Sequence, residues 1–166
     1  MTKGMYHYIH KARLNPEFLR KKMIEWRKGS AFVRVEKPLD TGKARMLGYK
    51  DKKGFVVVRV RLMRGGRKRP HRRKGRRSKR QTIRKTLHAN YRWVAEQRAA
   101  RKYKNLEVLN SYWIGKDGMH YFYEVILVDP RRPEIMNDEK LKWIVNAKGR
   151  VFRGLTSSAK KSRGLR

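Results

Sequence analysis

The sequence predicts an α+β fold in which helices flank a small antiparallel or mixed sheet, in the order β-α-β-α-β-β, with long basic extended arms. Three observations predict it. Short stretches rich in β-branched residues alternate along the chain with helical patterns, and capping residues precede those patterns. Other segments are so rich in Lys and Arg that they hold too few apolar side chains to form a core.

The first helix is predicted to begin at Asn15-Pro16-Glu17, which supplies an N-cap, a proline at the first helical position and an acid in the first turn. Leu19, Met23 and Trp26 recur at helical spacing, and basic residues fill much of the remaining surface up to Gly29. This pattern indicates an amphipathic helix with a basic outer face. Ahead of it, residues 5–9 form a short aromatic segment that either packs on the domain or stacks on bases.

Two strands and a short helix are predicted between residues 31 and 63. Residues 31–35 alternate as in a strand, and Asp40 or Thr41 can cap a short helix that ends at Gly48. Residues 55–63 are rich in β-branched side chains, and their alternation separates two faces. The face predicted to be core carries Val56, Val58, Val60 and Leu62, and the face expected to turn towards a polyanion carries Arg59 and Arg61.

A second helix and two further strands are predicted after residue 90. The helix covers residues 91–102, with Ala95 and Ala99 on its packed side and Arg92 and Glu96 elsewhere. Strands over 106–114 and 119–128 are joined by a glycine-flanked hairpin turn at 115–118. The chain then divides into an aromatic segment and helix (1–30), the first part of the core (31–63), a basic insertion (64–90), the second part of the core (91–145) and a basic C-terminal arm (146–166).

The charge of the chain indicates a polyanionic partner. It carries 47 Lys and Arg against 13 Asp and Glu, a net charge of +34 over 166 residues. The charge is densest between Arg64 and Arg80, where 11 of 17 residues are Lys or Arg and none is an acid. Such a segment cannot bury itself, and guanidinium groups bind phosphates through planar, bidentate contacts. Nucleic acid is therefore the leading class of partner.

Several other classes of function find no support in the sequence. There is no run of about 18 apolar residues, so we expect no membrane partner, and residues 1–10 hold no long apolar stretch of the kind that directs secretion. The chain has no cysteine, which excludes disulfides and cysteine-ligated zinc. No phosphate-binding G-x-x-x-x-G-K-[ST] loop occurs, the five histidines are scattered, and neither a metal, a cofactor nor a small-molecule substrate is expected.

A nucleic-acid enzyme is one rival interpretation. A two-metal nuclease needs converging acids, and Glu107, Glu124 and Asp129 belong to the predicted hairpin or its end. Acids among so many Arg and Lys are more often ion-pair partners, so we predict no catalytic residue. A second rival is a general nucleic-acid-compacting, chromatin-like protein, which would share the charge.

Seven stretches of the chain, in the same order, resemble the archaeal and eukaryotic large-ribosomal-subunit protein fifteen family, the type with no close bacterial counterpart of that name. The resemblance covers nearly the whole length. The stretches are residues 5–9, 43–50, 54–70 (with Arg-Gly-Gly-Arg-Lys-Arg-Pro at its end), 94–101, 109–113, 123–129 and 153–157.

The resemblance implies a structural, non-enzymatic component of the large subunit of the cytoplasmic ribosome, with an α+β core and extensions threaded into folded RNA. It implies large-subunit ribosomal RNA and neighbouring large-subunit proteins as partners. Together, charge and resemblance predict RNA contacts from the strand that leads into the insertion, from the insertion and from the C-terminal arm. The predicted contact residues are Arg59, Arg61, Arg64, Arg67, Lys68, Arg69, Arg72, Arg73, Lys74, Arg76, Arg77, Lys79, Arg80, Arg150, Arg153, Lys160, Lys161 and Arg163.

Overall fold

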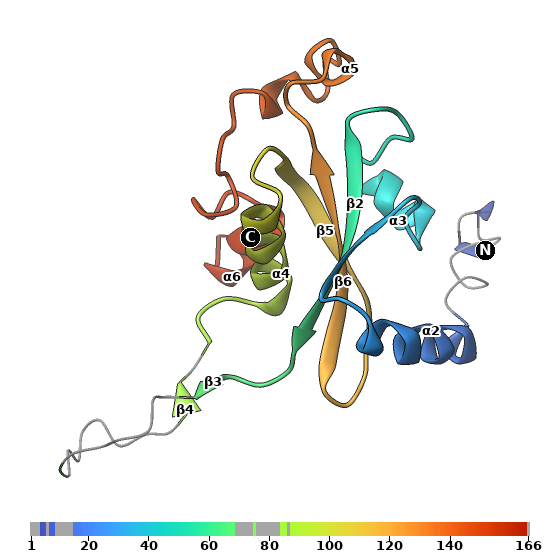
Figure 1. Ribbon diagram of the computed structural model, residues 1–166. Helices are drawn as coiled ribbons and strands as arrows, with labels where there is room; N and C mark the ends of the chain where they lie inside the picture. Colours follow the sequence, from blue (N-terminus) through green and yellow to red (C-terminus); the bar gives the residue numbers. More distant parts are fainter. Residues whose placement is uncertain are drawn as a thin grey trace.

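A four-stranded antiparallel sheet forms the centre of the computed structural model, which describes residues 4–5, 7–8, 15–68, 75, 84–85 and 87–165 (Figure 1). Its strands lie in the order β1 (Phe32–Val35), β2 (Phe55–Met63), β6 (His120–Val128) and β5 (Glu107–Lys116). Neighbouring strands all run antiparallel. The predicted α+β class with a small sheet flanked by helices is confirmed.

The longer helices begin where the sequence predicts, because side-chain caps bind their first free N–H groups. The Asn15 side chain accepts from the backbone N–H of Glu17 (3.1 Å) at the start of α2 (Pro16–Lys28), and Asn90 accepts from Trp93 (2.8 Å) at the start of α4 (Tyr91–Lys102). Shorter helical segments are α3 (Thr41–Met46), α5 (Pro133–Met136), the 3₁₀ helix η2 (Lys142–Ile144) and α6 (Ser157–Ser162).

Both faces of the sheet are buried, so the core has three layers. On one face, α2 and α3 cover a cluster that includes Trp26, Tyr112 and Phe122. On the other face, α4 and the C-terminal segment cover a cluster that includes Val58 and Leu127. Figure 1 shows α4 and α6 on one side of the strands and α2 and α3 on the other.

Helix α2 partly covers the basic face predicted for residues 55–63. Val58, Val60 and Leu62 are core residues as expected, but the opposite face packs beneath α2. There the Arg59 guanidinium lies 4.4 Å from the centre of the Trp26 ring. That this face also contacts a polyanion stays a prediction, because strand alternation separates two faces without showing which of them a helix covers.

The C-terminal segment is folded onto the core, so the predicted extended arm over residues 146–166 was wrong for the part that the structure describes. Val151, Thr156 and Ala159 are at most 1% exposed. The segment is held by Glu96, a fully buried acid of α4 that the sequence pattern had placed away from the packed side. Its carboxylate accepts hydrogen bonds from the hydroxyls of Ser111 (2.5 Å), Thr156 (2.6 Å) and Ser158 (2.6 Å).

Replacing Glu96 with Ala is expected to lower the free energy of unfolding by about 2–4 kcal/mol, because three buried hydroxyls lose their acceptor. Urea unfolding measures the loss, and limited trypsin digestion should show faster cleavage after Arg150 and Arg153. Glu139→Ala, at an exposed acid, is the control. A loss below ~1 kcal/mol with unchanged cleavage would contradict this role of Glu96.

A second acid, Asp138, joins the loop before β2 to the segment after α5. Lys50 and Lys52 both donate to its carboxylate, the latter at 2.7 Å, and Lys52 also donates to the backbone oxygen of Glu134 (2.7 Å). The hydrogen bonds from Lys50 and then Lys52 hold the pKa of Asp138 well below its ordinary value of 3.8. A carboxylate with a lowered pKa in the folded state stabilises the fold above its unfolded pKa, and this stabilisation is lost as the pH falls through the folded value.

For Asp138→Asn, the difference in unfolding free energy from the unsubstituted protein is therefore expected to be largest near neutral pH and to shrink below the ordinary carboxyl pKa of 3.8. Urea titrations between about pH 2 and pH 7 measure this difference, with Glu139→Gln as the control. A difference that stays constant over the whole range would show that the lysine contacts do not stabilise the charged form of Asp138.

Candidate nucleic-acid interface

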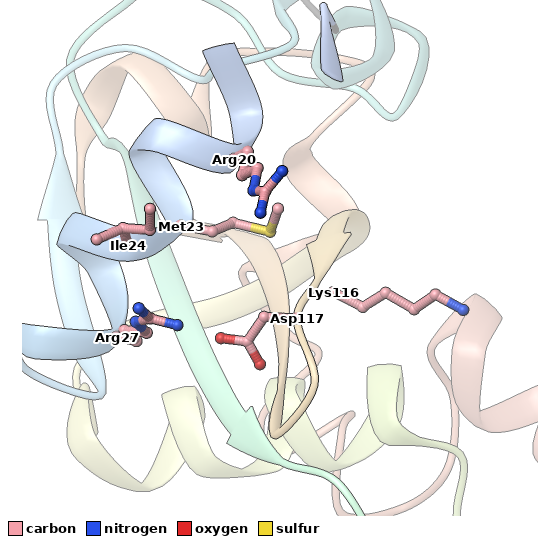
Figure 2. Close-up of a pocket in the computed structure, with 6 residues that line it drawn as sticks. All are labelled: Arg20, Met23, Ile24, Arg27, Lys116 and Asp117. Carbon is pink, nitrogen blue, oxygen red and sulfur yellow. The ribbon is translucent and has the colours of Figure 1, made fainter. Parts of the chain in front are cut away.

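Helix α2 places cations beside the turn that joins β5 to β6. Arg20 and Arg27 lie on one face of the helix and line a pocket together with Asp117 of that turn (Figure 2). Arg20, Lys21, Arg27 and Lys28 are all exposed. The helix thus presents a basic outer surface, as its sequence pattern predicts.

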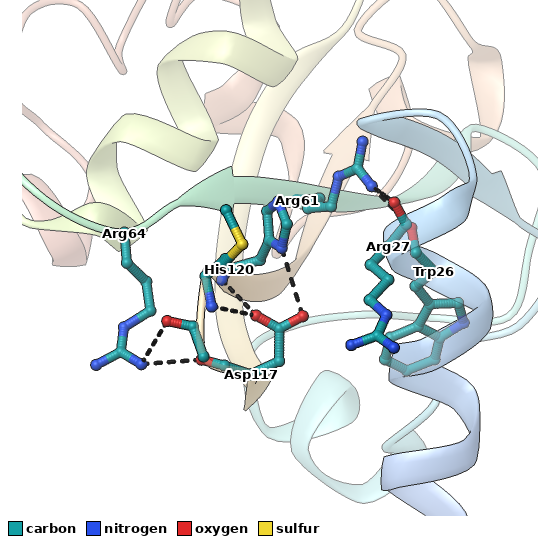
Figure 3. A network of polar contacts seen from close by, with 8 residues as sticks. Trp26, Arg27, Arg61, Arg64, Asp117 and His120 are labelled. Carbon is teal, nitrogen blue, oxygen red and sulfur yellow. Dashed lines mark hydrogen bonds and ion pairs between the residues drawn. The ribbon is translucent and has the colours of Figure 1, made fainter.

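Two arginines of β2 contact α2 and hold it in this position. The Arg61 guanidinium donates to the backbone oxygens of Trp26 (3.4 Å) and Arg27 at the end of the helix (Figure 3). Arg59 stacks on the Trp26 ring, and burial lowers its pKa, partly offset by the charges of Glu124 and Glu25. Cations at a helix C-terminus also satisfy its last free carbonyls. Both arginines therefore act within the fold.

The first end of the basic insertion is fixed to the core directly after β2. Arg64 donates to the backbone oxygens of Asp117 (2.9 Å) and Gly118 (3.2 Å) in the hairpin turn (Figure 3), and its guanidinium lies 5.2 Å from the centre of the Tyr121 ring. The Tyr91 hydroxyl then accepts from the N–H of Gly65 (2.8 Å) and donates to its carbonyl (2.9 Å). Gly65 has a φ of +99°, a conformation that glycine adopts without strain.

The second end of the insertion is fixed to α6. The backbone N–H of Asn90 donates to the Ser162 hydroxyl (3.1 Å), and the Asn90 side chain donates to the Ser158 carbonyl (2.8 Å). The Ser162 hydroxyl in turn donates to the His88 carbonyl (3.2 Å). Between these two ends, β3 (Arg67–Lys68) pairs antiparallel with β4 (Arg84–Lys85) in a ribbon that projects beyond the end of β2 (Figure 1).

The predicted contact residues fall into three groups. Arg153, Lys160, Lys161 and Arg163 are exposed on the C-terminal segment, as is Arg64 at the start of the insertion. Arg59, Arg61 and Arg150 make the internal contacts of the fold; Arg150 donates to the carbonyls of Val108 (2.7 Å) and Leu109 (2.8 Å). The structure describes only the backbone of Arg67 and Lys68. The other predicted contact residues lie outside the described residues: Arg69, Arg72, Arg73, Lys74, Arg76, Arg77, Lys79 and Arg80.

Two features of the site were not predicted. The cations of α2 were recognised as a basic face, but the pairing of that face with the hairpin turn depends on how α2 packs. Tyr91, the first residue of the helix predicted over residues 91–102, packs its ring against the core, but the two hydrogen bonds between its hydroxyl and Gly65 were not predicted. The sequence signal for this contact is the glycine pair that follows Arg64. Such a pair predicts a turn, and a neighbouring polar group can hold a turn in place.

The three acids considered for catalysis each bind a structural group. Glu107 accepts from the N–H of Gly149 (2.8 Å), and Asp129 lies 3.7 Å from Arg132. Glu124 is buried and accepts from the Tyr112 hydroxyl and the N–H of Leu39. Burial raises the pKa of Glu124, and these hydrogen bonds oppose the rise.

The described part of the chain contains no group of three or more His, Cys, Asp or Glu side chains placed to hold a metal ion. None of its helices is long and apolar enough to span a membrane.

The comparison with known protein families shows to which family the chain belongs. A family model described as Ribosomal L15 matches residues 4–166, which is nearly the whole sequence. The match confirms the resemblance seen in the seven stretches. Proteins of this class belong to the large subunit of the cytoplasmic ribosome. The chain belongs to the Ribosomal L15 family, a family of structural proteins of the large ribosomal subunit.

Proposed function

We propose that this protein stabilises folded large-subunit ribosomal RNA by neutralising phosphates of neighbouring RNA helices. The basic insertion supplies most of the contacts, and the exposed cations of α2 and the C-terminal segment add to them. The core fixes the relative positions of these three surfaces. No reaction is part of this function.

The observation that carries the proposal is the anchoring of the insertion at both ends. The Tyr91 hydroxyl, which accepts from Gly65, and the Arg64 guanidinium hold one end. Asn90 with α6 holds the other. The chain from Lys52 to Ala95 contains 18 Lys or Arg and no acid. A basic segment that leaves a rigid core at two fixed points can enter RNA in one register, whereas a free tail would bind in many.

Phosphate contacts set the affinity, and RNA shape sets the specificity. The major groove of A-form RNA is too narrow for side chains to read bases, so tertiary shape is what the insertion would recognise. If about 15 phosphates are neutralised, log K should fall against log[salt] with a slope on the order of −10. A general nucleic-acid-compacting protein would show a similar slope but no preference for folded RNA.

Reversing the charge of Arg67, Arg69, Arg72 and Arg73 to Glu tests the role of the insertion. We expect the salt slope for large-subunit ribosomal RNA to become less steep by about 3, since four phosphate contacts are lost. The affinity at about 0.1 M salt should fall by about a hundredfold or more. Filter binding measures both quantities, and circular dichroism should show that the core is unchanged.

The matched control reverses four exposed cations on the other parts of the surface, Arg34, Lys37, Lys43 and Lys53, and therefore changes the net charge equally. If the control loses as much affinity as the insertion variant, total charge rather than the insertion determines binding.

Tyr91→Phe tests whether the core holds the insertion in place. The substitution removes both hydrogen bonds to Gly65 and keeps the ring, which lies 4.8 Å from that of Tyr121. We expect hydrogen exchange at the Gly65 amide to speed up by about tenfold, while the free energy of unfolding falls by less than ~1.5 kcal/mol. Tyr121→Phe keeps the ring beside Arg64 and is the control. Equal exchange in all three proteins would mean that Tyr91 does not restrain the insertion.

A further inference from the structure

A pocket of about 390 Å³ lies between α2 and the β5–β6 turn, and none of the contacts described above fills it. Its lining residues are Arg20, Met23, Ile24, Arg27, Lys116 and Asp117. Figure 2 shows the Lys116 side chain extending away from the other five. The groups that can contact a ligand in the pocket are therefore two arginines, two apolar side chains and one carboxylate.

The apolar side of the pocket is built by neighbouring residues of α2. Met23 packs partly into the core, whereas Ile24 is 39% exposed. Gly115 of β5 makes room for Met23, because a Cβ atom at that position would lie 3.0 Å from the Met23 sulfur. A polarisable thioether beside a branched aliphatic chain forms a surface on which a flat ring can pack.

Two cations flank this apolar surface. Arg20 and Arg27 are seven residues apart, so they lie two turns apart on the same face of α2, with Met23 and Ile24 between them. Both guanidinium groups are exposed, and no ion pair joins either of them to an acid within the described ranges. They are therefore available to bind phosphates on either side of a ring held between them.

Asp117 gives the pocket one directed acceptor. Its Oδ1 accepts from the backbone N–H groups of Met119 (2.8 Å) and His120, while its Oδ2 has only a long contact with the His120 ring nitrogen, at 3.4 Å. Burial alone would raise the pKa of Asp117, but the hydrogen bonds from His120 and Met119 hold it below its ordinary value. An ionised carboxylate only accepts hydrogen bonds, so it favours a ligand that donates.

We propose that this pocket binds an unpaired RNA base that carries an exocyclic amino group. The base packs on Met23 and Ile24, its amino group donates to Oδ2 of Asp117, and the flanking phosphates lie against Arg20 and Arg27. This inference rests on the proposed function, since it names one nucleotide contact within ribosomal RNA binding. A lone phosphate is disfavoured because the carboxylate repels it, and an apolar peptide is disfavoured because the two cations would have to be desolvated.

Site-specific crosslinking in the complex of the full chain with large-subunit ribosomal RNA tests the proposal. A diazirine analogue of leucine at position 24 keeps the size of Ile24 and reacts with whatever fills the pocket. We expect one main crosslink, to an adenine, cytosine or guanine that is unpaired. The same analogue at position 18, where Phe18 is exposed on α2 outside the pocket, is the control.

Asp117→Asn then tests the acceptor. Oδ1 of the amide can still accept the backbone bonds of the turn, while an NH₂ donor replaces Oδ2. The crosslink yield from position 24 should fall by about tenfold, as for a lost hydrogen bond to a charged acceptor. A crosslink to uridine, to paired nucleotides, to protein or to no partner would overturn the proposal, as would an unchanged yield in Asp117→Asn. If the full chain fails to bind ribosomal RNA at all, the proposed function falls as well, and filter binding measured first separates the two cases.

Discussion

The carboxylate of Glu96 is the contact on which the arrangement of the basic surfaces depends. It joins α4, β5 and the C-terminal segment through three hydroxyl groups, with no solvent reaching it. The same helix holds one end of the insertion through Tyr91, and the segment that Glu96 holds supplies α6, which binds the other end at Asn90. A single buried acid thereby connects both ends of the basic insertion to the same rigid core.

Several arginines stabilise the fold itself, although the chain carries a large excess of positive charge. Arg61 binds the last carbonyls of α2, and Arg150 binds two carbonyls of β5, an edge strand of the sheet. Burial lowers the pKa of Arg150, and the nearby acids Glu96 and Glu107 oppose that change. Guanidinium groups suit this task because they offer several donors in a fixed plane. Basic composition alone therefore does not show which cations face a partner.

Local patterns predicted the elements well, and tertiary contacts explain where they failed. Strand β2 and helix α4 have the predicted bounds because β-branched alternation and the Asn90 cap act within a few residues. Helix α6 was missed because its polar residues become buried only through Glu96, which is 60 residues away from Thr156. The two register shifts in β5, between Val108 and Asn110 and between Trp113 and Gly115, likewise depend on pairing with β6. The site at α2 was predicted only as a basic face, since its pocket requires the hairpin turn beside it.

We infer that the rigid core presents its cations in an arrangement that fits the shape of folded ribosomal RNA, and competition binding at two salt concentrations tests this inference. Folded large-subunit ribosomal RNA competes with duplex DNA of equal length for the full chain. Shape recognition predicts a preference for the RNA of about a hundredfold or more that persists when the salt is raised, since non-specific phosphate contacts weaken equally on both partners. Affinities that match at low salt and fall together at high salt would show that the protein does not recognise RNA shape.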